Sequence, residues 1–132
     1  KDFIVNYDQN SNPLNITKSI EIVYGLRNFI GNANKFSENK IFINIKSDSD
    51  FTEVMIEDDG EGYPKDVLSK IGEPYIKSFK SSIKSKSGLG LGIFIGKTLL
   101  EKNYANILCR NSQTRSGAEV SIKWKNEDLL KL

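Results

Sequence analysis

The stretch Ile20 to Phe36, IEIVYGLRNFIGNANKF, decides which fold this chain can adopt. Its apolar side chains recur at spacings of three and four residues, the period of a helix with one face against a core. We therefore predict a single helix that ends near Ser37 to Asn39, with Thr17 as its N-cap. The apolar positions are Ile22, Leu26, Phe29, Ile30 and Ala33.

Polar residues form a second stripe on this helix. Asn28, Asn32 and Lys35 fall within an arc of about 60°. Asn is a poor helix former, so two of them on one stripe favour a site over a solvated face. Amide oxygens suit Mg²⁺, which shares its coordination with phosphate oxygens, and a lysine can meet phosphate as a point charge. On this helix alone, an ordinary polar face explains the stripe equally well.

Length and composition bound the remaining possibilities. The 132 residues suffice for one domain, and a net charge of +2 argues against a nucleic-acid binder driven by bulk electrostatics. The chain contains no histidine, which removes the commonest general base and any Ser/His triad. Its start at Lys1 indicates a piece of a longer protein. The single cysteine, Cys109, fits a reducing compartment and is expected to be a small core residue.

Alternating apolar residues predict strands on both sides of this helix. We expect short strands at Phe3 to Val5 and Leu14 to Ile16, and a hairpin of KIFINIK (40–46) and FTEVMIE (51–57). A second hairpin is expected from Asn106 to Arg110 and Gly117 to Lys125, with a turn between them. The last residues, 126–132, form a tail that the sequence does not assign.

The first hairpin leads into Asp58-Asp59-Gly60-Glu61-Gly62-Tyr63-Pro64. This could be an ordinary turn after a strand. The functional interpretation is that Asp58 accepts a hydrogen bond from a buried base while Gly60 and Gly62 leave room for the ring. Since adenine offers an amine where guanine has an oxygen, a carboxylate at this place selects adenine.

A long stretch without periodicity follows a short helix expected at Pro64 to Ile71. Residues 73–87 are predicted to be a lid, because a loop of this length in a compact domain is usually functional or disordered. Its lysines, Lys84 among them, suit a polyphosphate, although a solvated flexible loop explains them almost as well. The lid ends in Gly88-Leu89-Gly90-Leu91-Gly92, and a helix to about Lys102 is expected to begin there and offer its N–H groups to an anion.

These motifs together resemble a known family. Asn28-x-x-x-Asn32-Ala33-x-Lys35 is similar to the N-box of sensor histidine kinases, and Asp58-x-Gly60-x-Gly62 and Gly88-x-Gly90-Leu91-Gly92 resemble their two glycine boxes. The resemblance to this catalytic and ATP-binding domain, whose Bergerat fold is shared with gyrase, Hsp90 and MutL, extends from about Phe3 to Lys125. YGLRNFIGNANKFS (24–37) and the stretch from Asp66 to Tyr75 further resemble the RegB/PrrB/ActS group of redox-responsive kinases.

The resemblance implies a two-layer α/β sandwich, with a mixed and mainly antiparallel sheet and helices on one face, spanning residues 1–132. It implies that Asn28 and Asn32 ligate Mg²⁺, that Lys35 contacts phosphate, and that Asp58 binds adenine. Backbone of the second glycine box would approach the phosphates of ATP. The cofactor-binding positions so implied are Asn32, Lys35, Asp58, Gly60, Gly62, Lys84, Gly88, Leu89, Gly90, Leu91 and Gly92.

The resemblance also implies partners and a location. The γ-phosphoryl of ATP would go to a histidine on a separate dimerisation and phosphotransfer domain of the parent kinase, and from there to a response regulator. The isolated domain is expected to be monomeric, to bind no nucleic acid, and to be the cytoplasmic portion of a membrane-anchored bacterial sensor kinase. Where hydrolytic members carry a glutamate base, this chain has Asn28, which cannot take up a proton. A hydrolytic or serine-kinase relative, or a non-catalytic adenine-nucleotide sensor, stays open as an alternative.

Overall fold

The computed structural model describes residues 1–8, 19–68 and 89–132. The predicted strand Leu14 to Ile16, the whole of the predicted lid at 73–87, which includes Lys84, and Gly88 lie outside these ranges. The described elements, in chain order, are β1 (Asp2–Tyr7), α1 (Ile20–Phe36), β2 (Lys40–Ser47), β3 (Phe51–Asp58), α2 (Lys65–Leu68), α4 (Leu89–Lys102), β4 (Asn106–Asn111), β5 (Ala118–Lys125) and α5 (Asn126–Leu129).

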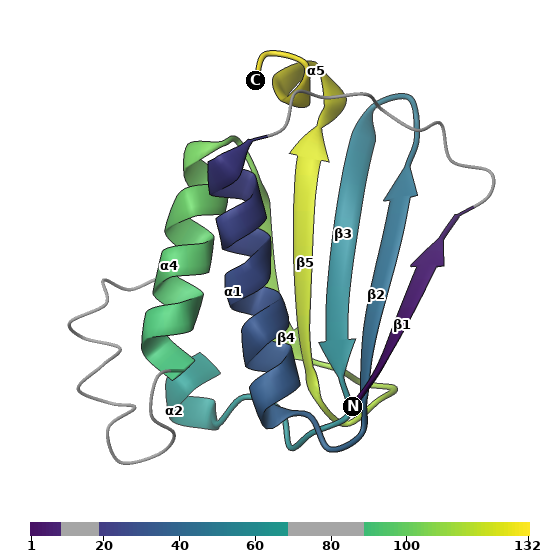
Figure 1. The fold of residues 1–132 in the computed structure, drawn as a ribbon, viewed down its shortest axis with the longest axis vertical. Helices are drawn as coiled ribbons and strands as arrows, with labels where there is room; N and C mark the ends of the chain where they lie inside the picture. Colours follow the sequence, from purple (N-terminus) through teal and green to yellow (C-terminus); the bar gives the residue numbers. More distant parts are fainter. Residues whose placement is uncertain (9–18, 69–88) are drawn as a thin grey trace.

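The strands form one five-stranded sheet in the order β1-β2-β3-β5-β4. β1 pairs with β2 in parallel, and every other pair is antiparallel. Figure 1 shows α1 and α4 side by side over one face of this sheet. The predicted two-layer sandwich with a mixed, mainly antiparallel sheet and helices on one face is therefore confirmed.

Helix α1 has the predicted limits, Ile20 to Phe36, but a different cap. The hydroxyl of Ser19 accepts a hydrogen bond from the Ile22 N–H at 3.3 Å, so Ser19 and not Thr17 is the N-cap. The physical reason is that a cap must directly precede the first helical residue, and here Ser19 takes the extended backbone that the position requires. The Ser37 N–H bonds the Ala33 carbonyl at 2.9 Å, which closes the helix where the sequence predicted.

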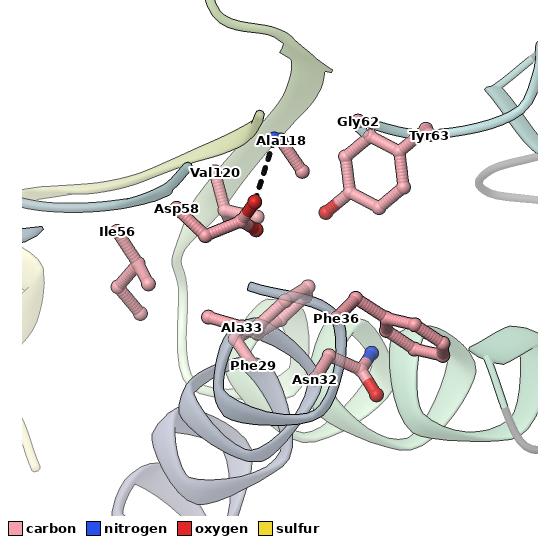
Figure 2. A pocket seen from close by; sticks show the side chains of 10 residues that line it. All are labelled: Phe29, Asn32, Ala33, Phe36, Ile56, Asp58, Gly62, Tyr63, Ala118 and Val120. Atoms are coloured by element: carbon pink, nitrogen blue, oxygen red, sulfur yellow. Dashed lines mark hydrogen bonds between the residues drawn. The ribbon is translucent and has the colours of Figure 1, made fainter. Parts of the chain in front are cut away.

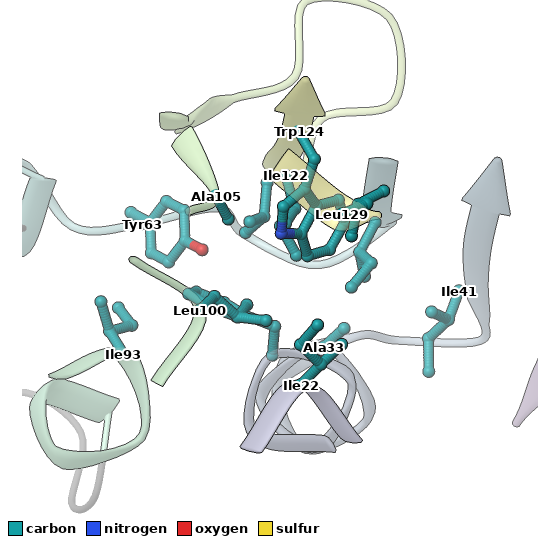
Figure 3. Packing of buried hydrophobic residues seen from close by; sticks show 13 residues of the cluster. Ile22, Ala33, Ile41, Tyr63, Ile93, Leu100, Ala105, Ile122, Trp124 and Leu129 are labelled. Atoms are coloured by element: carbon teal, nitrogen blue, oxygen red, sulfur yellow. The ribbon is translucent and has the colours of Figure 1, made fainter. Parts of the chain in front are cut away.

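The core lies between the helices and the sheet (Figure 3). Period-two alternation in the strands sends Ile41, Ile56 and Ile122 to this side, where each is at most 2% exposed.

Both predicted hairpins are present, and Asp48 shapes the first turn by accepting hydrogen bonds from the Asp50 and Phe51 N–H groups. Cys109, expected inside, is only half-buried on β4.

The two helices approach each other closely because glycines face the contact. A Cβ at Gly96 would lie 2.7 Å from the Phe29 ring, and one at Gly25 would lie 2.6 Å from the Leu100 side chain. Helix α4 already begins at Leu89, so Leu89, Gly90, Leu91 and Gly92 form its first turn. Among the described residues, no helix combines the length and apolarity that crossing a bilayer requires.

The chain after β5 is not an unassigned tail. Asn126 begins the short helix α5, and its side chain accepts a hydrogen bond from the Thr52 hydroxyl at 2.7 Å and donates one to the Asp48 carbonyl at 2.8 Å. Leu129 is buried against the core. A four-residue helix has no period that sequence could reveal, and its order depends on these contacts with the first hairpin.

Candidate functional site

A pocket opens between α1 and the sheet, where β3 ends and β5 begins (Figure 2). It encloses about 420 Å³ of space not filled by atoms, part of it open to solvent. Its walls are mainly apolar and carry few polar groups, as is common in small-molecule sites. The lining residues are Phe29, Asn32, Ala33, Phe36, Ile56, Asp58, Gly62, Tyr63, Ala118 and Val120.

Asp58 is the charged group of the pocket. It is the last residue of β3 and is 4% exposed. Its Oδ1 accepts hydrogen bonds from the Gly60 N–H at 2.9 Å and the Ala118 N–H at 3.3 Å. Burial raises the pKa of Asp58 above its ordinary value, although these two hydrogen bonds oppose the shift. Both bonds end on Oδ1, so Oδ2 is the atom available to a ligand in the pocket.

Glycines allow backbone to close tightly around this carboxylate. A Cβ at Gly117 would lie 2.0 Å from the Asp58 carbonyl oxygen and 2.3 Å from Oδ1. A Cβ at Gly60 would lie 2.1 Å from the Phe36 carbonyl oxygen, so the space beside Gly60 is filled by the end of α1. In this structure, both glycines hold the walls of the pocket together.

Tyr63 forms one side of the pocket and is 8% exposed. Its backbone is held at both polar atoms by one amide, since Asn111 Oδ1 accepts from the Tyr63 N–H at 2.6 Å and Asn111 Nδ2 donates to the Tyr63 carbonyl at 3.2 Å. Gly62 permits this approach through a φ of 82°. The hydroxyl of Tyr63 points into the pocket, toward the side occupied by Asp58 (Figure 2).

Burial and the neighbouring Cys109 thiol raise the pKa of Tyr63 well above 10. Burial likewise raises the pKa of Cys109 to about 11. Both groups therefore stay protonated near neutrality. Cys109 is a thiol and not a thiolate under these conditions, which leaves it a weak nucleophile.

Asn32 reaches the pocket from α1. Its Nδ2 is buried and has no hydrogen-bond partner among the described residues. The amide rests against α4, where a Cβ at Gly92 would lie 2.8 Å from Asn32 Oδ1. A buried amide without a hydrogen-bond partner lowers the stability of the fold, and a ligand that bonds to it removes this penalty, which favours binding. A half-turn about the last torsion exchanges donor and acceptor with little change of shape.

The structure brings only some of the predicted site residues together. Asn32, Asp58 and Gly62 line the pocket, whereas Asn28 Nδ2 turns back along α1 to the Tyr24 carbonyl at 2.8 Å. Lys35 is exposed, with its ammonium 5.3 Å from the centroid of the Phe36 ring. The first turn of α4, from Leu89 to Gly92, directs backbone N–H groups outward at the end of the helix nearest Asn32.

Sequence reasoning missed several residues of this site. Tyr63 lies within the quoted glycine motif but received no role, and Asn111 and Gly117 were assigned only to the last hairpin. Position in the motif was the available signal for Tyr63. For Asn111 no signal exists, because its contact with Tyr63 joins residues 48 positions apart.

The donor set fits a magnesium ion that arrives with its ligand. Among residues 1–8, 19–68 and 89–132, no group of three or more acidic, cysteine or histidine side chains could hold a metal by itself. Asn32 supplies a neutral oxygen, which suits a hard cation that keeps most of its waters and phosphate ligands.

Comparison with known proteins places these features in context. Residues 17–128 match the family described as Histidine kinase-, DNA gyrase B-, and HSP90-like ATPase. The sensor histidine kinase RegB of Cereibacter sphaeroides is 34% identical in an alignment that covers 87% of this chain and 28% of RegB. The chain thus spans little more than a quarter of this relative.

Solved structures show the same fold. The catalytic domain of the histidine kinase ThkA in a nucleotide-free form superposes with a TM-score of 0.73 at 21% identity, covering 95% of this chain and 80% of that one. Full-length ShkA, solved in complex with AMPPNP, gives a TM-score of 0.66 at 20% identity, covering 92% of this chain and 25% of that one.

Proposed function

Because the chain belongs to the histidine kinase-, DNA gyrase B- and HSP90-like ATPase family, we propose that it binds MgATP in the pocket between α1 and the β3–β5 edge. Within that family, we propose that it is the catalytic domain of a two-component sensor histidine kinase and passes the γ-phosphoryl to a histidine of another domain. The chain itself has no histidine, so the acceptor must come from elsewhere.

The observation that carries this proposal is the Asp58 carboxylate at the inner end of an apolar pocket. A flat purine ring would lie between the walls of apolar side chains, and its exocyclic amine would donate to Asp58 Oδ2. A guanine in the same orientation would place a carbonyl oxygen against the carboxylate, leaving two acceptors facing each other. The pocket should therefore prefer ATP to GTP.

Asn32, with help from Asn28, would hold Mg²⁺, and Lys35 and the N–H groups of the α4 first turn would meet the phosphates. Mg²⁺ would supply charge neutralisation on the phosphate oxygens. The side chains of this chain would then orient the polyphosphate and keep the ring in place. Asn28 would have to leave its bond with the Tyr24 carbonyl to take part.

Phosphoryl transfer needs positioning and charge stabilisation more than it needs a protein base, provided that the acceptor brings its own nucleophile. A histidine imidazole does so. Water, in contrast, needs a base, and the amide of Asn28 cannot accept its proton. We therefore expect slow hydrolysis of ATP and faster transfer to a histidine.

Isothermal titration calorimetry of the 132-residue chain tests nucleotide binding. We expect MgATP and MgADP to bind, GTP to bind much more weakly, and EDTA to reduce the affinity for ATP. Equal affinity for ATP and GTP would contradict the proposal.

A transfer assay tests the reaction. With ATP alone the chain should not phosphorylate itself, whereas adding the folded dimerisation domain of the parent kinase should yield phosphohistidine. Release of inorganic phosphate in the absence of that domain, at a rate comparable to transfer, would instead support a hydrolytic relative.

The similarity to RegB supports a further proposal about the whole protein. There, this domain would be the cytoplasmic part of a membrane-anchored kinase whose phosphohistidine serves a response regulator. The response of the parent kinase to redox conditions is part of the same proposal.

A further inference from the structure

Besides Asp58 and Asn32, the pocket is lined by a third side chain with a polar group, the hydroxyl of Tyr63. In Figure 2 it lies across the pocket from Asn32 and points toward the side of Asp58. The hydroxyl is out of bulk water, since Tyr63 is 8% exposed. A polar atom in an otherwise apolar wall has a large influence on which ligand fits.

Tyr63 is also held more firmly than a packed aromatic residue requires. Asn111 binds both polar atoms of its backbone, and Gly62 takes the left-handed conformation that brings the two segments together. The ring packs in the core cluster with Ile93 and Leu100 (Figure 3). A group fixed in this way loses little entropy when it forms a hydrogen bond with a ligand.

The chemistry of the hydroxyl is complementary to that of Asp58. The Tyr63 hydroxyl, which lies beside the Cys109 thiol, stays protonated and can donate, whereas a carboxylate at Asp58 can only accept. Adenine offers the matching pair, because its exocyclic amine is a donor and the ring nitrogens N1 and N7 on either side are acceptors.

We propose that Tyr63 is a specificity-determining residue of this pocket and that its hydroxyl donates to the ring nitrogen beside the amine that Asp58 accepts. This inference rests on the proposed function, because it concerns the same base. Asp58 and Tyr63 would form a two-point contact with adenine, and a base that lacks either the amine or the ring nitrogen would be rejected.

A thermodynamic cycle between protein and ligand tests this contact. The Tyr63→Phe variant should bind ATP roughly three- to tenfold more weakly than the wild-type chain in calorimetry, the effect of one neutral hydrogen bond. 1-Deaza-ATP and 7-deaza-ATP each replace one ring nitrogen with C–H. One of the two should bind the wild-type chain more weakly by a similar factor and should show no further loss with Tyr63→Phe.

A matched control is Tyr104→Phe, which removes the hydroxyl from a tyrosine that is 50% exposed and lies outside the pocket. It should leave ATP affinity and both analogues unchanged. Thermal unfolding of Tyr63→Phe without nucleotide should stay near that of the wild-type chain, which separates a lost contact from a lost fold.

Two outcomes would overturn the inference about Tyr63. One is an unchanged affinity of Tyr63→Phe for ATP, and the other is full binding of both deaza analogues to the wild-type chain. The second needs no variant and so holds even if Tyr63→Phe folds poorly. A wild-type chain that does not prefer ATP to GTP would instead contradict the proposed function itself.

Discussion

At the residue scale, the Asp58 carboxylate is expected to favour ATP binding but to lower the stability of the nucleotide-free fold. Burial raises its pKa, so folding favours the protonated acid. The stability contributed by this group is fully present below the ordinary pKa of aspartate and is lost as the pH rises through the raised value. At pH 7 the ionised carboxylate therefore destabilises the nucleotide-free fold.

We accordingly expect Asp58→Asn to be more stable than the wild-type chain at pH 7 and to lose this advantage as the pH falls toward 4. The variant keeps an oxygen for the Gly60 and Ala118 N–H groups but cannot accept from adenine in the same way, which should cost about 1 to 3 kcal/mol of ATP binding. Urea unfolding over a pH series and calorimetry measure the two effects. Unchanged ATP affinity would contradict the role assigned to Asp58.

Its neighbour Asp59 provides a control of opposite sign. Burial favours its protonated form, but hydrogen bonds from the N–H groups of Asn39, Lys40 and Glu38 outweigh this and lower the pKa of Asp59. Its contribution to stability is present above the ordinary pKa and is lost as the pH falls through the lowered value. Asp59→Asn should therefore be less stable than the wild-type chain at pH 7, without a change in base preference.

At the element scale, the contact between α1 and α4 includes both a residue of the pocket, Asn32, and a residue of the core, Phe29. A Cβ at Gly92 would meet the movable amide of Asn32, whereas one at Gly96 would meet the packed ring of Phe29. We expect Gly92→Ala to weaken MgATP binding by roughly fivefold or more with little loss of stability, because the amide can turn away. Gly96→Ala should lower the free energy of unfolding by about 1 to 3 kcal/mol.

Helix α1 provides a control at Gly31, where an added Cβ would meet nothing within 4 Å. Gly31→Ala should raise the free energy of unfolding by about 0.5 to 1 kcal/mol, since it only removes backbone freedom. Denaturant unfolding and calorimetry on the three variants separate the effects. Equal loss of binding in Gly92→Ala and Gly96→Ala would show that the amide of Asn32 has no special role.

Helix α5 is a second case in which an element depends on distant contacts. Asn126 is 7% exposed and bonds both Thr52 and Asp48. Asn126→Ala should lower the free energy of unfolding by about 1 to 2 kcal/mol, since it leaves the Asp48 carbonyl without this donor. Glu127→Ala, at an exposed position of the same helix, should have little effect in the same urea titration. Similar stability of both variants would mean that the end of the chain is not part of the cooperative fold.

At the scale of the whole molecule, the pocket joins the two layers of the sandwich. A ligand that contacts Asn32 on α1 and Asp58 on β3 must stabilise the folded chain against the unfolded one. At 100 times its dissociation constant, MgATP should add about 2.7 kcal/mol to the free energy of unfolding. A thermal shift that rises with MgATP, and falls with EDTA or with GTP in its place, is the expected result. A shift independent of the base would point to phosphate contacts alone.

Much of the fold follows from local sequence. The helix Ile20 to Phe36 and both hairpins were predictable because burial on one face imposes a period of 3.6 or 2 on neighbouring residues. The start of α4 and the order of α5 were less accessible. Gly90 and Gly92 in the first turn of α4 disfavour a helix locally. Helix α5 has only four residues, and its Asn126 side chain is held by the Asp48 carbonyl, far away in the sequence.

The residues of the site also fall into those that the sequence could predict and those that it could not. The residue types at Asn32 and Asp58, together with the family resemblance, predicted a nucleotide pocket; both residues line one pocket, and its binding of nucleotide stays a prediction. The sequence could not indicate that Tyr63 faces this pocket or that Asn111 fixes it, since that contact joins separate parts of the chain.

The sequence by itself determined the helix with its amide stripe, the two hairpins and the carboxylate that follows the first, because each depends on residues close along the chain. Only the tertiary structure decided which of these polar groups share a pocket, which stay outside it, and which glycines serve packing. The physical reason is that distance in space, burial and the pairing of polar atoms arise only when α1, α4 and the sheet close on one another.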